Sequence, residues 1–164
     1  MPKSKSPRKR YDPNKRMNRM VQTMEFAVQQ MPMRADAQRD IEIAAHIALE
    51  RLIHGGDKDS LYILATAFDV THELAIKGCG ADYLPEIKRG MAAIVRTKKA
   101  ANLTGVWKLD AADVNAVSTA LQIHDAQLET ASRRLIVETM HEVMARVEGG
   151  SNETEFETLL LEAA

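Results

Sequence analysis

Two pairs of side chains have the spacing of metal ligands. Glu138 and His141 form an E-x-x-H pair, and Asp69 and His72 form a D-x-x-H pair. Because residues three apart share one face of a helix, each pair could offer a carboxylate and an imidazole to the same cation, as di-iron helical bundles do. Those sites also need two further inward Glu residues and a second E-x-x-H, which the sequence does not supply. We therefore interpret both spacings as coincidental and predict neither a metal site nor a cofactor.

No residue stands out as a catalytic nucleophile. The chain has no Gly-rich phosphate-binding loop, no nucleophile elbow and no Cys-x-x-Cys pair. Cys79 follows a predicted helix C-terminus, where the helix dipole disfavours a thiolate, so we predict that the chain is not an enzyme. A single cysteine cannot form an internal disulfide, and neither a membrane-spanning run nor a secretory signal is present. We therefore expect a cytoplasmic protein with no membrane contact.

The charge of the chain is strongly divided. Residues 1–19 hold eight Lys or Arg side chains against one acid, a net charge of +7, whereas the whole chain has a net charge of -1. A basic arm can neutralise nucleic-acid phosphates, and an aromatic ring among its cations can stack on a base. The predicted nucleic-acid-binding residues in this segment are Arg8, Lys9, Arg10, Tyr11, Lys15, Arg16 and Arg19.

A second basic region covers residues 86–108, where six basic side chains accompany a single acid. Four of them form one contiguous face of a helical wheel, and we predict further phosphate contacts from this face: Lys88, Arg89, Arg96 and Lys99. Two other interpretations stay open. Residues 109–164 have a net charge of -8, so the basic segments could pair with them, within a chain or across a symmetric dimer. The acidic half could instead imitate nucleic acid in an inhibitor of a host defence or regulatory complex.

Helical stripes run through most of the sequence, and no strand alternation of useful length is present. We predict an all-α, single-domain bundle of five or six helices over residues 14–150, following a flexible, disordered basic arm at residues 1–13. The acidic residues 151–164 suit a short or frayed terminal helix. One helix is expected over residues 36–54, where the glycine pair that follows stops it.

The helix after Trp107 has the clearest start signal, because Asp110 is a good N-cap residue. Residues 111–148 then contain no Gly or Pro, and we predict one long helix over this range. The apolar stripe shifts by one residue near Leu135, however, and a turn at Ser132 could divide the helix in two.

Two further expectations concern apolar stripes. Four methionines share one face of the helix that begins near Asn14, and we expect this face to pack in the core, although Met also suits adaptable binding surfaces: Met17, Met20, Met24 and Met31. His72 and His124 also fall on apolar stripes, where a hydrogen-bonded core histidine is the expected role.

Three stretches carry a resemblance to a known group of proteins. They are RKRYDPNKR at 8–16, GCGADYLPEIKRG at 78–90 and LTGVWKLDAADVNAVSTALQIHDAQLETASR at 103–133, and they resemble small helical proteins encoded on phages and plasmids. The resemblance implies a mobile-element origin and transfers no catalytic or binding residue. The sequence therefore predicts a non-enzymatic accessory or regulatory protein that binds nucleic acid. The alternatives are a protein-protein interaction module and a structural helical homo-oligomer built on the apolar repeat of residues 114–135.

Overall fold

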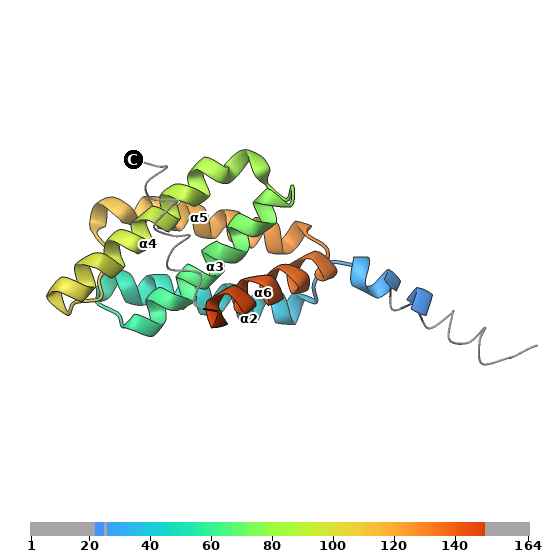
Figure 1. The fold of residues 1–164 in the computed structure, drawn as a ribbon, viewed down its shortest axis with the longest axis horizontal. Helices are drawn as coiled ribbons and strands as arrows, with labels where there is room; N and C mark the ends of the chain where they lie inside the picture. The colour runs from blue at the N-terminus through green and yellow to red at the C-terminus, as the bar shows by residue number, and fades with distance from the viewer. Residues whose placement is uncertain (1–21, 25, 150–164) are drawn as a thin grey trace, which may run out of the picture.

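The fold is a bundle of α-helices, seen in the computed structural model of residues 22–24 and 26–149 (Figure 1). Residues 22–24 and 26–30 are helical and precede the bundle. The bundle helices are α2 (Ala35–His54), α3 (Lys58–Ile76), α4 (Leu84–Thr104), α5 (Ala111–Thr130) and α6 (Arg133–Glu148), and a short 3-10 helix, η1 (Ala81–Tyr83), precedes α4.

The predicted all-α class is confirmed. No strand occurs within the described ranges, where an isolated antiparallel bridge pairs Pro32 with Ser132. The expected arm at residues 1–13 and the acidic segment at 151–164 both lie outside these ranges.

Local signals set the helix boundaries. Gly55 ends α2 with a φ of 99°, a left-handed conformation that suits glycine, so the predicted end of this helix is confirmed. Asp57 is then the N-cap of α3, and its carboxylate accepts a hydrogen bond from the Ser60 backbone N–H at 2.7 Å. The predicted cap at Asp110 is also confirmed, because its carboxylate accepts from the Ala112 backbone N–H at 2.9 Å.

The predicted single helix over residues 111–148 is wrong. Helix α5 ends at Thr130 and α6 begins at Arg133, because Ala131 and Ser132 between them are extended, with ψ angles of 147°. The Ser132 hydroxyl accepts a hydrogen bond from the Leu135 backbone N–H at 3.3 Å and so caps α6. The one-residue shift of the apolar stripe marks this break.

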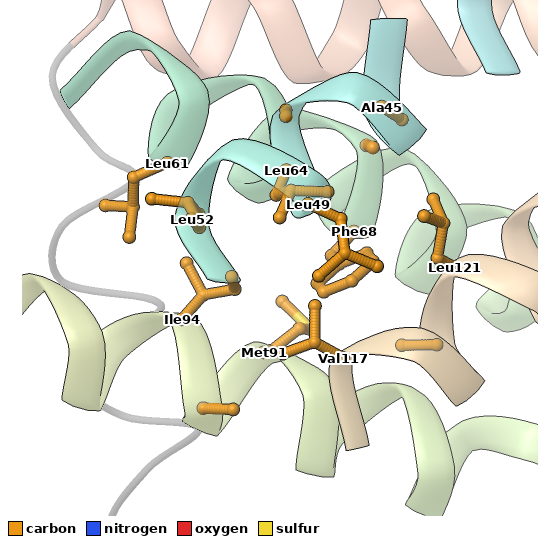
Figure 2. Close-up of a cluster of buried hydrophobic side chains, with 14 of the residues drawn as sticks. Ala45, Leu49, Leu52, Leu61, Leu64, Phe68, Met91, Ile94, Val117 and Leu121 are labelled. Carbon is orange, nitrogen blue, oxygen red and sulfur yellow. The ribbon is translucent and has the colours of Figure 1, made fainter. Parts of the chain in front are cut away.

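Two apolar clusters fill the bundle. The larger one joins α2, α3, α4 and α5 around Phe68, which Figure 2 shows among side chains from all four helices. Its members include Leu52, Leu64, Ile94, Val117 and Leu121, each at most 2% exposed. The smaller cluster joins α3, α5 and α6 through Leu74, Leu128, Ile136 and Val143. Burial of each such side chain contributes about 1.5–3 kcal/mol to folding. The apolar repeat of residues 114–135 is therefore largely used inside one chain.

Helices α4 and α5 cross closely at Gly90. A Cβ atom at this position would lie 2.5 Å from the Ala120 Cβ and 3.2 Å from the Ala116 carbonyl oxygen. Glycine is therefore required there by space rather than by backbone conformation. The crossing fixes α5 against α4 and brings Asp113 of α5 close to Arg96 of α4.

The described part of the methionine stripe does not pack in the core, so that expectation is wrong for these residues. Met24 is 62% exposed and Met31 is 57% exposed, and two further apolar side chains, Phe26 and Val28, are exposed beside them. Figure 1 shows this helical segment (blue) outside the bundle, next to the junction of α5 and α6. Its apolar face therefore has no cover from the bundle.

Candidate nucleic-acid interface

The predicted basic face of α4 is already partly engaged within the bundle. The Arg96 guanidinium donates two hydrogen bonds to Asp113 of α5, from Nη2 to Oδ1 at 2.6 Å and from Nε to Oδ2 at 3.1 Å. These bonds raise the pKa of Arg96 above its ordinary value. Arg89 donates to Glu86, one turn away on the same helix, at 2.7 Å. A phosphate would have to compete with a carboxylate for each of these two guanidinium groups.

The two lysines of the predicted face differ in their surroundings. Lys88 is half-buried and has an interaction partner, whereas Lys99 is exposed. Lys99 forms no ion pair with any residue that the structure describes. Of the four predicted residues on α4, Lys99 is therefore the most accessible to a phosphate.

Part of the acidic half of the chain is paired within the described bundle. Lys77, the residue that follows α3, donates to Glu142 of α6 at 2.5 Å, and Arg146 of α6 donates to Glu73 of α3 at 2.8 Å. A further pair joins α2 to α5, from His46 Nε2 to Asp125 Oδ2 at 2.8 Å. Exposed pairs of this kind contribute about 0–1 kcal/mol each, so they orient helices more than they stabilise them. Three carboxylates of α5 and α6, Asp113, Glu138 and Glu142, thus have a Lys or Arg of the described chain as partner, and Asp125 has His46.

The described chain places further basic residues where the N-terminal segment joins the bundle. We call residues 31–34 and 132–134 the N-terminal junction; here the Arg133 backbone N–H donates to the Met31 carbonyl oxygen at 2.8 Å. Arg133 is exposed, and Arg39 is exposed in the second turn of α2, which starts at this junction. Neither side chain forms an ion pair within the described residues.

The prediction from sequence missed Arg39 and Arg133, because only the fold brings residues 31 and 133 together. The adjacent pair Arg133-Arg134 was visible in the sequence, but nothing local linked it to the N-terminus. The predicted contacts of the basic N-terminal segment, residues 1–19, lie outside the described residues and stay predictions: Arg8, Lys9, Arg10, Tyr11, Lys15, Arg16 and Arg19.

The two pairs with metal-ligand spacing differ in how far they are buried. Glu138 is exposed and accepts from Arg134 at 2.7 Å, and His141 is exposed beside it. Asp69 and His72 are half-buried on α3, and each has a partner. Among the described residues, no three His, Cys, Asp or Glu side chains are grouped as cation ligands.

Of the two histidines that were expected in the core, one is buried there. His124 is 2% exposed, and its Nδ1 lies 2.9 Å from the Thr71 hydroxyl oxygen. The expectation is confirmed for His124, whereas His72 is half-buried.

Comparisons with known proteins add nothing to this geometry. No protein-family model, curated protein or solved structure matches the chain. Within the described residues, none of the helices combines the length and the apolar character that crossing a bilayer requires.

Proposed function

We propose that the chain is a non-enzymatic accessory or regulatory protein of a mobile element that binds nucleic acid. The observation that carries the proposal is the concentration of eight basic side chains against one acid in residues 1–19. Cations at this density neutralise phosphates, release counterions and bind with little sequence preference. Tyr11, which lies among these cations, adds a ring on which a base can stack.

The ion pairs of the bundle favour this proposal over internal pairing of the basic segment. Three carboxylates of α5 and α6 already face a Lys or Arg of the bundle, Asp125 faces His46, and the Asp110 carboxylate caps α5. Fewer acidic groups are therefore left for the N-terminal cations than the net charge of the acidic half suggests.

The same ion pairs change which bundle residues we expect to touch phosphate. Arg39 and Arg133 are exposed at or next to the N-terminal junction, where residues 31–34 meet residues 132–134, so one nucleic-acid strand could contact both. Arg96 is held by Asp113 and is a weaker candidate than Lys99. We propose that the basic segment supplies most of the affinity and that Arg39 and Arg133 extend its contact surface.

A matched pair of variants on α2 tests this allocation. Arg39→Gln and Arg51→Gln each remove one exposed guanidinium from the same helix, but Arg51 is in its last turn, about 18 Å away along the axis. Arg39→Gln should lower the slope of log affinity against log salt by about 0.7–0.9, the effect of one lost phosphate contact. Arg51→Gln should leave the slope unchanged. Equal slopes for both variants would remove Arg39 from the interface.

A second function, binding to a protein partner, is favoured by the exposed apolar segment. Met24 and Phe26 on the N-terminal helical segment and Met31 just after it are each more than half exposed. Apolar surface of this kind suits a partner protein, such as a component of a host defence or regulatory complex. Co-purification from host extract after nuclease treatment separates the two functions: a partner retained by the native chain and lost with Met24→Gln and Met31→Gln would favour protein binding.

A further inference from the structure

An apolar cavity lies among α2, α3, α5 and α6. Its volume is about 480 Å³, within the range of pockets that hold small molecules. Ile41 and Ala45 of α2, Ala67 and Val70 of α3, Leu128 of α5 and Met140 of α6 contribute apolar walls. Asp59 and Tyr62, which are exposed, also belong to the lining.

His124 also lines this cavity and has a fixed tautomer. The Thr71 hydroxyl donates its proton to the Ala67 carbonyl oxygen at 2.8 Å, so its oxygen is left to accept from His124 Nδ1 at 2.9 Å. Nδ1 therefore carries the ring proton, and Nε2 has a lone pair and no proton. Burial, with the charge of nearby His46 as a smaller cause, lowers the pKa of His124 to about 4, so the ring is neutral at pH 7.

The Nε2 atom of His124 accepts from no donor in the described part of the chain. It is buried, and it has no hydrogen-bond partner among the described residues. A buried acceptor that lacks a partner is unfavourable, and a bound molecule that supplies a donor removes that penalty. Three residues further along α5, the Gln127 amide donates to the carbonyl oxygens of Thr71 and Cys79 at 3.1 and 2.6 Å, which ties this part of α5 to the neighbouring backbone.

We propose that this cavity binds a small, uncharged and largely apolar molecule with one O–H or N–H group, which donates to His124 Nε2. The apolar walls favour an apolar body, since burying a charge against them is costly. The single unprotonated nitrogen selects for a donor over an acceptor. The site is independent of the proposed nucleic-acid contacts, because none of its lining residues belongs to residues 1–19, to the N-terminal junction or to α4.

Two probes of nearly the same shape test the proposal on the full-length chain. 2-Naphthol has one hydroxyl donor, and naphthalene has none. Titration of each at pH 7.5, followed by fluorescence, should show that 2-naphthol binds about tenfold more tightly, the effect of one buried hydrogen bond. Equal affinities, or no binding of either probe up to its solubility limit, would overturn the proposal.

Two variants separate the donor from the cavity. His124→Leu should bind both probes equally, because the acceptor is gone while the apolar walls stay. Ala44→Trp, at an exposed position that lines the cavity, should fill the space and weaken both probes about tenfold or more, with little effect on the core. A preference for 2-naphthol that survives in His124→Leu would show that the hydroxyl bonds elsewhere and would refute the assignment.

Two further measurements keep the test decisive if His124→Leu folds poorly. In the native chain, the nitrogen-15 resonance of His124 Nε2 should move upfield on addition of 2-naphthol and stay in place with naphthalene; no movement would contradict the proposal. Deletion of residues 151–164, which include Phe156 and Leu159, should leave probe affinity unchanged. A large gain in affinity would mean that these residues of the chain occupy the cavity, and would refute a small-molecule site.

Discussion

Lowering the pH should destabilise this protein through His124 in particular. The buried ring has a pKa of about 4 in the folded chain, against 6.5 for an unperturbed histidine. Below pH 6.5 the unfolded chain therefore takes up a proton that the folded chain refuses until about pH 4. The stabilising effect of the neutral ring is complete above the unfolded pKa and is lost as the pH falls through this window.

The size of the effect follows from the pKa shift. Each pKa unit corresponds to about 1.4 kcal/mol, so the full shift is worth about 3 kcal/mol, of which about 2 kcal/mol should be lost between pH 7 and pH 4.5. Urea denaturation at these two pH values measures this loss as a change in the free energy of unfolding. Because other groups titrate in the native chain and in His124→Leu alike, the native chain should lose about 2 kcal/mol more than the variant.

A second histidine variant provides the control for this experiment. His46, whose ring is paired with Asp125, is the smaller cause of the lowered His124 pKa. His46→Gln should raise the pKa of His124 slightly and keep most of the acid-dependent loss. Parallel pH profiles for the native chain and His124→Leu would refute the reasoning, since they would mean that burial of this ring does not oppose its protonation.

Three further predictions concern the bundle. Gly90→Ala should lower the thermal unfolding midpoint, because the new Cβ would lie 2.5 Å from the Ala120 Cβ. Overpacking of this kind costs about 1–3 kcal/mol, which outweighs the helix-propensity gain of about 1 kcal/mol. An unchanged or higher midpoint would contradict the close crossing. Ser132→Ala should lower the free energy of unfolding by about 1 kcal/mol in urea denaturation through loss of the α6 cap, and a neutral result would show that the cap is unimportant. Arg96→Gln and Asp113→Asn should couple by about 0.5–1 kcal/mol in a double-mutant cycle, while Arg96→Gln leaves nucleic-acid affinity unchanged; a large loss of affinity would return Arg96 to the interface.

Signals carried by neighbouring residues predicted the fold well. The glycine pair after His54 and the cap at Asp110 mark helix ends within a few residues of themselves, and both predictions are confirmed. The break at Ser132 was harder, because serine is common both inside helices and at caps. The bridge from Ser132 to Pro32 helps to stabilise the break. This contact joins residues a hundred positions apart, so no local pattern reveals it.

The candidate interface was harder to predict than the fold. The helical wheel correctly placed Arg96 on a polar face of α4, but it could not show that Asp113 of the next helix lies within 2.6 Å of its guanidinium. The methionine stripe has the same limitation. An amphipathic pattern identifies an apolar face at Met24 and Met31, and only the arrangement of the helices decides whether another part of the chain covers it.

The proposed function rests most directly on the basic N-terminal segment. Deletion of residues 2–16 removes seven basic side chains and almost no apolar surface, so helical content should hardly change. The decisive measurement is the affinity of the native and deleted chains for a labelled duplex and a labelled single strand, starting at about 50 mM salt, where phosphate contacts are strongest. The native chain should bind with a steep salt dependence, and the deletion should weaken binding sharply and flatten the slope by up to about 0.9 for each lost contact. Absence of binding by the native chain at that salt concentration, or equal affinity and slope for both chains, would contradict the proposed function.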